Sequence, residues 1–336
     1  MSDGADPQAR KTGAQRAARE RSSQRCVLMG DPSHFSVIGG ANPHTRTRWG
    51  TKRRVDRAFA IRQWQRLRDV LQDLGVRVFV VPPDAAQPGL VYPANAGFMQ
   101  DIDAELARAS RRFHLANLLP TRAGEKPHYE RVLAAAGIPT ATIDDRYRFE
   151  GEADFFPAGD RYLLTHGALE RQRFVPALAF PPWKRIYGFR TDARVEEVLA
   201  PLVAPKEILC IELRLEAHYH GDTVLCAFGP GRRFLLGYRE GITESAWSRL
   251  REEFGDDLIS LEIEDAARYA ANSFALTQGG EFILLLPDGV SERLLAQVRE
   301  RGVTPITVDV SEFLKKGGGS VKCMIGDLGV MPPTSA

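Results

Sequence analysis

The stretch VDRAFAIRQWQRLRDVLQDLGVRVFVV, residues 55–81, contains a helix, a stop and a strand in direct succession. Six apolar side chains recur there at helical spacing: Ala58, Ile61, Trp64, Leu67, Leu71 and Leu74. They predict a helix from about Val55 to Leu74 with one apolar face. Gly75 supplies the stop, because glycine readily adopts the left-handed conformation that ends a helix. The β-branched run VRVFVV then predicts a strand, so this unit indicates a mixed α/β fold.

The same order of helix, glycine and strand recurs further along the chain. A second helix is predicted in HYERVLAAAG (128–137), before a strand at about 139–143. Further helices are predicted in DARVEEVLAPL (192–202), TESAWSRLREEFG (243–255) and SERLLAQVRERG (291–302). Strands are predicted in EILCIELR (207–214), TVLCAFGP (223–230), RRFLLGY (232–238), EFILLLP (281–287) and TPITVDV (304–310). The units share no recoverable sequence repeat, so any internal symmetry is structural.

The charge balance points to no polyanionic partner. The 336 residues contain 45 Lys and Arg against 43 Asp and Glu, a formal net charge of +2. No global field therefore selects nucleic acid or an anionic membrane, although local patches need separate judgement. The run TRTRWGTKRRVDR (45–57) has six basic residues and a Trp that suit phosphates. Such a run is more often a solvated helix start, so neither nucleic acid nor a membrane is expected as a partner.

The chain is predicted to form one catalytic domain after a polar tail. Residues 1–24 lack the apolar segment of a secretory signal and are rich in Gly, Ala, Ser and Arg, which predicts a disordered tail and a cytoplasmic location. No apolar run approaches the roughly 20 residues of a membrane span. Residues 25–336 contain no Pro/Ser/Gly-rich linker, so a single domain is expected. Within it, GALERQRFVPALAFPPWKRIY (167–187) is interpreted as an inserted loop or lid, or as a surface excursion without function.

One of the four cysteines stands apart from the others. Cys26, Cys210 and Cys226 lie in apolar runs that suit buried strands, and none of the four shows CxxC spacing, which argues against a zinc ribbon or a redox pair. Cys323 follows GGGSVK instead. Glycines there allow the chain and a ligand to approach closely, which distinguishes Cys323 from the three cysteines in apolar runs.

Two acidic or histidine-rich segments show alternating polar residues. In HYHGDT, His218, His220 and Asp222 would point to one face of a strand. That pattern suits a metal site, a catalytic histidine beside a cation-binding carboxylate, or a polar strand face without function.

In FEGEAD, the acidic residues Glu150, Glu152 and Asp154 alternate in the same way and would line one pocket wall. Packed carboxylates raise one another's pKa unless a cation lies among them. Arg190 in GFRTD is a candidate partner, or a fork that binds a substrate carboxylate.

Seven motifs, read in order, carry a family resemblance. They are NPHT at Asn42, VYPANAG at Asn95, RAGEKPHYE at Arg122, FEGEAD at Glu150, YGFRTD at Arg190, HYHGDT at His220, and SEFLKKGGGSVKC ending at Cys323. In this order they resemble the guanidino-group modifying enzymes, which include amidinotransferases, arginine deiminases and dimethylarginine dimethylaminohydrolases. The resemblance implies the pentein fold, a pseudo-fivefold symmetric α/β propeller built of ββαβ-like units around a central polar site.

The resemblance also implies roles for individual residues. Cys323 matches the family nucleophile and His220 the catalytic histidine, while Glu150 matches the acidic partner of that histidine, with Glu152 as the alternative. The implied substrate-binding residues are Asp222, Asn95, Arg190, Asn42, Glu152, Asp154 and Asn272. Asn95 stands where deiminases carry an Asp, as in the subgroup that includes arginine dihydrolases. An amide binds a guanidinium more weakly, so it could instead orient a water or a product.

The expected function is a cysteine-dependent hydrolase that acts on the guanidinium group of arginine or a modified arginine through a covalent amidino-thioether. One alternative is an amidinotransferase that passes the amidino group to an amine acceptor. Another is a metal-dependent hydrolase that uses His218, His220 and Asp222. The favoured hydrolase needs no cofactor or metal, and its expected partner is a small guanidino substrate. The sequence leaves the oligomeric state open.

Overall fold

The computed structural model describes residues 23–38, 42–47 and 49–333. Of the predicted tail 1–24, residues 1–22 lie outside this described part, and Gln24 is already the first residue of strand β1 (Gln24–Gly30). Within the described residues, no helix is long and apolar enough to cross a membrane.

Five three-stranded sheets share one pattern, in which an antiparallel pair is followed by a helix and a third strand parallel to the second. The first sheet contains β17 (Gly326–Met331), β1 and β2 (Arg77–Val81), with α2 (Arg57–Asp73) between β1 and β2. The second contains β3 (Gly97–Met99), β4 (Phe113–Leu115) and β5 (Thr140–Thr142), with α3 (Lys126–Ala135). The third contains β6 (Phe155–Ala158), β7 (Arg161–His166) and β10 (Ile208–Glu212), with α4 (Glu196–Val203).

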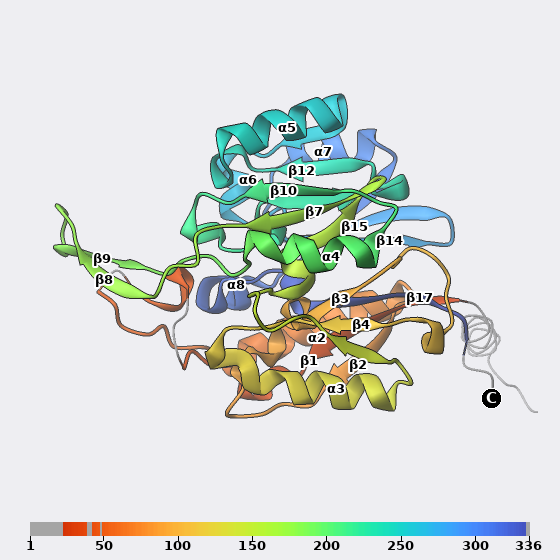
Figure 1. Cartoon of the computed structure of the whole chain (residues 1–336), viewed down its shortest axis with the longest axis horizontal. Coiled ribbons are helices and arrows are strands. Elements are labelled where there is room, and N and C mark those ends of the chain that lie inside the picture. Colours follow the sequence, from red (N-terminus) through yellow and green to blue (C-terminus); the bar gives the residue numbers. More distant parts are fainter. Residues whose placement is uncertain (1–22, 39–41, 48, 334–336) are drawn as a thin grey trace, which may run out of the picture.

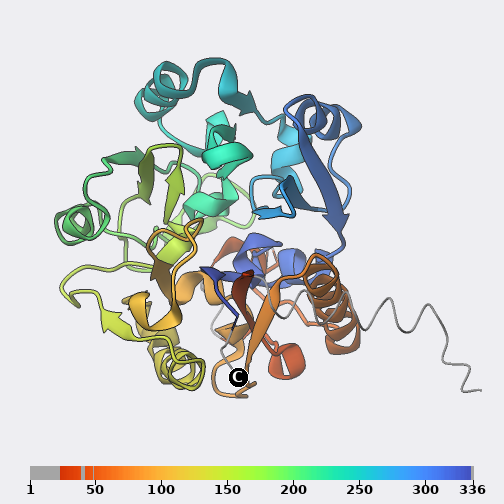
Figure 2. The same ribbon diagram turned by 90° about the vertical axis from the view of Figure 1, so that its right-hand side faces the viewer.

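The remaining two sheets repeat this order in the C-terminal half. The fourth contains β11 (Leu225–Phe228), β12 (Phe234–Gly237) and β13 (Leu258–Ser260), with α5 (Glu244–Phe254). The fifth contains β14 (Phe274–Gln278), β15 (Glu281–Pro287) and β16 (Val303–Val308), with α7 (Glu292–Glu300). Two short helices, α6 (Ile263–Ala267) and α8 (Ser311–Gly317), link units. Figure 2 shows the chain passing around a common centre with helices on the outside.

The helix and strand predictions are confirmed, with small shifts at the ends. Helix α2 begins after Asp56, whose side chain accepts a hydrogen bond from the Phe59 amide, and Gly75 follows it with φ +77°. Its apolar face buries Trp64 and Leu67 against the strands of the first and fifth sheets. Capping and burial together fix the helix where the apolar spacing predicted it.

The first strand of each unit is preceded by a tight turn or a short connection. Four of these are 3-10 turns: η4 (Pro93–Ala96), η7 (Gly151–Ala153), η10 (Gly221–Thr223) and η14 (Lys322–Met324). Turn η7 contacts both η4 and η10, and η14 contacts η4. The approach is close enough to require glycine: Gly151 has φ +64°, and a Cβ there would lie 2.5 Å from the Gly97 carbonyl oxygen. The turns therefore meet where the units meet.

A hairpin of β8 (Arg173–Pro176) and β9 (Trp183–Ile186) lies between β7 and α4 and projects from the body at the left of Figure 1. It falls within residues 167–187, the segment interpreted as an insertion.

Candidate active site

The candidate residues come from the turns that precede the first strands of the five units. Asn95 lies in η4, Glu150 precedes η7, and His220 precedes η10. Asn272 lies just before β14, and Cys323 lies in η14 before β17. All five side chains are buried. Each unit therefore contributes at least one polar group to the same place.

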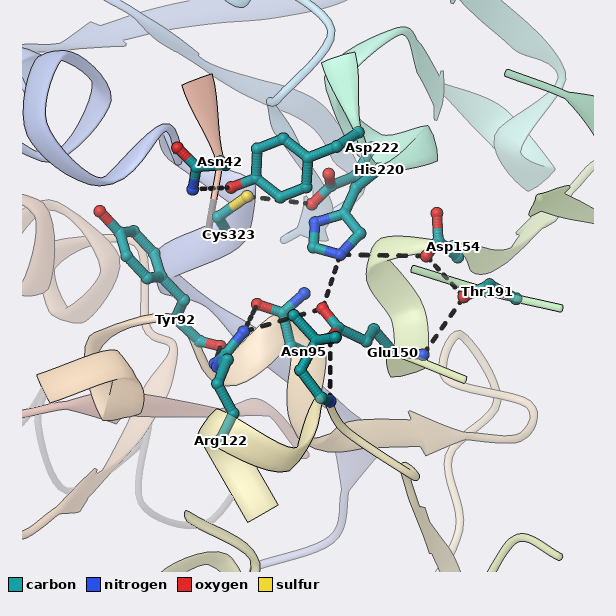
Figure 3. Close-up of polar contacts among 12 residues, drawn as sticks. Asn42, Tyr92, Asn95, Arg122, Glu150, Asp154, Thr191, His220, Asp222 and Cys323 are labelled. Atoms are coloured by element: carbon teal, nitrogen blue, oxygen red, sulfur yellow. Dashed lines mark hydrogen bonds and ion pairs between the residues drawn. The ribbon is translucent and has the colours of Figure 1, made fainter. Parts of the chain in front are cut away.

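A cavity of about 330 Å³ lies beside this convergence. Six candidate residues line it: Asn42, Asn95, Glu150, Arg190, His220 and Cys323. Figure 3 shows Asp222 beside His220, with dashed lines that join Cys323 to Asp222 and His220 to Glu150. The lining thus combines a thiol, an imidazole, a carboxylate and a guanidinium.

Cys323 lies between a carboxylate and an amide. Its Sγ donates to Asp222 Oδ2 at 3.3 Å and accepts from Asn272 Nδ2 at 3.1 Å. Burial and, next, the charge of Asp222 raise the pKa of the Cys323 thiol well above its usual value. Burial also raises the pKa of Asp222 to about 6, against the lowering effect of His220 and Lys322. A cation bound here would stabilise both ionised groups.

Asn272 holds the turn that carries Cys323. Its Oδ1 accepts from the amides of Ser320 (2.9 Å) and Cys323 (3.1 Å), and its backbone oxygen accepts from the Lys322 amide at 3.0 Å. Its Nδ2 also donates to the Asp222 carbonyl at 3.1 Å. One side chain therefore fixes the thiol, its turn and the segment that carries Asp222.

His220 is held by Glu150, not by Glu152. Its Nε2 lies 2.8 Å from Glu150 Oε2, whose other oxygen accepts from the Leu119 amide at 3.3 Å. Burial alone would raise the pKa of Glu150, but the hydrogen bond and charge of His220 and the charges of Arg122 and Arg190 lower it to about 2. Glu150 is thus an anion that orients the imidazole.

The predicted row of three carboxylates along one pocket wall is wrong. FEGEAD forms the 3-10 turn η7 and not a strand, so successive carboxylates point in different directions. Glu152 and Asp154 do not line the 330 Å³ cavity.

Asp154 supports the site from behind. It accepts from Thr165 Oγ1 (2.7 Å), Thr191 Oγ1 (2.6 Å) and the Gly221 amide (2.9 Å), and its Oδ2 lies 4.0 Å from His220 Nε2. It therefore joins the two turns that carry Glu150 and His220.

Glu152 faces the opposite side of the nucleophile turn. Lys322 Nζ lies 2.7 Å from its Oε1, which also accepts from the Asp327 amide at 2.7 Å. Glu152, Lys322 and Asp222 line a second cavity of about 30 Å³. Burial raises the pKa of Glu152 to about 7, against the lowering effect of Lys322. The Lys322 charge thus pairs with Glu152 and also lowers the pKa of Asp222.

The predicted alternation of His218, His220 and Asp222 on one strand face is also wrong, because HYHGDT forms two successive 3-10 turns. His218 stacks on Tyr269 (ring centroids 4.8 Å) and contacts the Thr223 carbonyl oxygen through Nδ1 at 3.2 Å. Burial lowers the pKa of His218 to about 4. Among the described residues no group of three His, Cys, Asp or Glu side chains is placed to hold a metal ion.

Arg122 is a site residue to which the sequence analysis gave no role, although its motif was recognised. Its Nη1 donates to Asn95 Oδ1 at 2.7 Å and lies 3.9 Å from Glu150 Oε2, while Glu125 binds the rest of its guanidinium. Asn95 Nδ2 is buried and has no hydrogen-bond partner. The oxygen of Asn95 is therefore occupied, and its donor group remains for a ligand.

Asn42 and Arg190 meet at Tyr219, a second residue that sequence reasoning missed. Asn42 Nδ2 donates to Tyr219 Oη at 3.1 Å and to the Gly317 carbonyl at 2.8 Å. The Arg190 guanidinium lies 5.0 Å from the centroid of the Tyr219 ring. Tyr219 is adjacent to His220 in sequence, which is the signal that could have identified it.

Comparisons with known proteins agree with this architecture. The family model described as "N,N dimethylarginine dimethylhydrolase, eukaryotic" matches residues 219–330. The N(G),N(G)-dimethylarginine dimethylaminohydrolase of Mycobacterium tuberculosis is 30% identical over 308 residues, which cover 91% of this chain and 86% of that protein.

Two solved structures share the fold. The N-terminal domain of ArgZ, a cyanobacterial arginine dihydrolase, superposes with a TM-score of 0.73 at 22% identity, over 92% of this chain and 99% of that one. A dimethylarginine dimethylaminohydrolase in adduct with S-methyl-L-thiocitrulline has a TM-score of 0.64 at 20% identity, over 91% and 100%.

Fold, site and relatives together define a guanidino-group modifying enzyme, which confirms the resemblance carried by the motifs. The similarity to a dimethylarginine dimethylaminohydrolase supports hydrolysis at a C–N bond of a guanidino group. Within that class, the chain belongs to the dimethylarginine dimethylaminohydrolase family.

Proposed function

We propose that this enzyme is a cysteine-dependent hydrolase of arginine or a modified arginine that works through a covalent amidino-thioether on Cys323. The observation that carries the proposal is that Cys323, His220 and Glu150 line one cavity, with Asp222 3.3 Å from the thiol. A nucleophile, an acid/base group and an anion that orients it are the parts that such a reaction needs.

Substrate binding prepares the nucleophile. The guanidinium of the substrate lies near Asp222 and Glu150, and Arg190 binds the substrate carboxylate. Burial and Asp222 raise the pKa of the Cys323 thiol, which favours its protonated form before substrate binds. The substrate cation opposes both effects and favours loss of the thiol proton.

Two chemical steps follow. The thiol proton passes to His220, the Cys323 thiolate adds to the guanidinium carbon, the C–N bond breaks, and His220 donates that proton to the departing amine. His220 then removes a proton from water, the hydroxide adds to the amidino carbon, and the C–S bond breaks to regenerate the thiolate. In the alternative amidinotransferase reaction, an amine acceptor replaces the water.

The free donor of Asn95 suits a role in the second step, the attack of water on the amidino carbon. Because Arg122 occupies its oxygen, the unpaired Nδ2 presents a donor. A donor repels a cationic guanidinium but suits the oxygen of a water or of a carbonyl product. We therefore propose that Asn95 orients the oxygen-bearing group, while Glu152 and Asp154 act as supports and not as substrate ligands.

The test is to incubate the purified protein with arginine, methylated arginines and agmatine, with and without an added amine, and to identify products by mass spectrometry. Citrulline with release of an amine or ammonia supports the hydrolase, whereas amidine transfer to the added amine supports the alternative. Cys323→Ala should abolish turnover and the protein-bound adduct, while Cys210→Ser, a half-buried cysteine on β10, should leave both unchanged. Full activity of Cys323→Ala would contradict the cysteine mechanism. So would inactivation of the enzyme by a chelator.

We also propose that residues 25–336 form one cytoplasmic catalytic domain whose five units are related by pseudo-fivefold symmetry. The support is that each unit has the same order of an antiparallel pair, a helix and a parallel strand. Superposition of each unit on the next tests the symmetry: rotations that differ widely from a fifth of a turn would contradict it.

A further inference from the structure

Exposed large apolar side chains gather at one end of the molecule. Among the described residues nine such side chains are exposed, and five of them lie on residues 167–187, named here the projecting hairpin: Leu169, Phe174, Leu178, Phe180 and Trp183. A sixth, Trp49, packs edge-to-face on Phe180 with ring centroids 5.3 Å apart. Leu178 is fully exposed. Isolated exposed apolar residues are ordinary, but such a concentration marks an interaction surface.

The projecting hairpin receives little support from the rest of the chain. Strands β8 and β9 pair only with each other among the described strands, and Figure 1 shows them extending away from the five sheets. A two-stranded hairpin alone is marginally stable in water. Its base is fixed, because Glu216 Oε1 accepts from the amides of Tyr187 (2.9 Å) and Gly188 (2.8 Å). The body thus anchors the base and leaves the apolar tip uncovered.

The projecting hairpin has an uncharged tip flanked by basic residues. Residues 174–183, FVPALAFPPW, contain no charged or polar side chain. Basic residues lie directly below this tip on both strands: Arg171, Arg173 and Lys184 are exposed, and Arg185 stacks on the Phe174 ring at 5.3 Å. The nearby acid is Glu170, which pairs with Arg173 at 3.4 Å.

Trp49, which belongs to the basic run of the sequence, lies beside the same tip. Trp49 makes the contact to Phe180, and Lys52, Arg53 and Arg54 in its loop are exposed. The local charge is therefore strongly positive although the chain as a whole is near neutral. Two such surfaces would repel each other, which disfavours a second copy of this chain as the occupant.

We propose that the projecting hairpin and residues 49–54 form a docking surface for an anionic lipid membrane. The uncharged tip enters the boundary between headgroups and acyl chains, and the basic residues below it contact anionic headgroups. Nucleic acid fits less well, because phosphates need cations at the point of contact and this tip presents Leu178 and two prolines there. The expectation of no membrane partner rested on net charge, which does not describe this local surface.

Co-sedimentation of the full chain with vesicles tests the proposal. We expect binding to vesicles of phosphatidylcholine mixed with phosphatidylglycerol, weakened by salt, and little binding to phosphatidylcholine alone. Leu178→Ser combined with Phe180→Ser should reduce binding at least tenfold. Arg171→Gln combined with Lys184→Gln should reduce it by about fivefold for each cation removed. Matched controls are Ile263→Ser and Arg66→Gln, an exposed apolar and an exposed basic residue elsewhere.

Hydrolysis in solution by every variant shows that the fold is intact, because none of these residues lies in the catalytic cavity. Four results would overturn the proposal. The first is no binding to anionic vesicles at low salt, and the second is binding that the tip variant does not weaken. The third is a wild-type dimer that the tip variant converts to a monomer. The fourth is tight binding of a single-stranded oligonucleotide, abolished by the tip variant, in a protein that does not bind lipid.

Discussion

The folded chain disfavours the ionised form of Asp222. Burial raises its pKa from 3.8 to about 6, and its Oδ1 has no hydrogen-bond partner. A carboxylate whose folded pKa is raised binds more protons in the native state, so stability falls as pH rises from about 4 to about 6. At neutral pH the full penalty is present, and a bound substrate cation would relieve it.

We therefore expect Asp222→Asn to be inactive and yet more stable than wild type at neutral pH, by about 1–2 kcal/mol. The advantage should vanish below about pH 4, where Asp222 is protonated in both states. Urea unfolding at the two pH values measures this. Equal stability of both proteins at neutral pH would show that burial does not strain this carboxylate.

Glu150 should act through His220. With Glu150→Gln, the imidazole loses its charged partner at 2.8 Å, so we expect kcat to fall by about 10²–10⁴ with a smaller change in KM. Because the Glu150 pKa is lowered to about 2, its contribution to stability is present above about pH 4.5 and disappears as pH falls toward 2. The variant should lose this part of the acid dependence. Asp144→Asn, a half-buried carboxylate paired with Arg146, is the control.

Lys322, which precedes Cys323 in the turn η14, should influence the pH dependence of the reaction. It lowers the pKa of both Asp222 and Glu152. Replacement by Met removes the cation, so the acid limb of the kcat/KM profile should move to higher pH. Lys322→Arg, which keeps the charge, should restore the profile at least partly. A lower rate for Lys322→Met with an unmoved pH profile would mean that Lys322 only supports the turn.

At the level of elements, the regular structure was predictable and the turns were not. The apolar spacing of 55–74 and the β-branched runs were correct because burial on one face determines both. The alternation of Glu150, Glu152 and Asp154 imitated a strand, yet Gly151 at φ +64° turns the chain between them. The contacts of Asn272 with the Cys323 turn are between residues 51 apart, and no local pattern encodes them.

Close approach of the turns gives a test at this scale. Gly151→Ala adds a methyl group 2.5 Å from the Gly97 oxygen, whereas Gly159→Ala has a similar φ of +62° and open space. We expect Gly159→Ala to cost about 1–2 kcal/mol, from the left-handed backbone alone. Gly151→Ala should lower the free energy of unfolding by about 1–3 kcal/mol more than Gly159→Ala does. It should also lower activity, because η4 carries Asn95 and η7 directly follows Glu150. Denaturant unfolding compares them, and equal losses would contradict a tightly packed centre.

At the level of the whole molecule, the two ends of the described chain lie in one sheet. Gln24 pairs with Met331 across β1 and β17. A circular permutant that joins these ends and opens between Gly279 and Gly280, in the exposed turn of β14 and β15, should fold and retain activity within about tenfold.

The matched control opens the chain between Asn95 and Ala96 and should be inactive, since that turn is buried in the site. Turnover and circular dichroism measure both proteins. Failure of the Gly279 permutant to fold would mean that the order of the units along the chain, and not only their contacts, determines the structure.

Cys323 is three residues from β17, the strand that pairs with the beginning of the described chain. During translation the ribosome therefore adds the residues of the other site turns before it adds Cys323. A nascent or interrupted chain has the carboxylates and the imidazole of the site but lacks this thiol. The Cys323 thiol is therefore added to the chain together with the strand that joins the fifth unit back to the first.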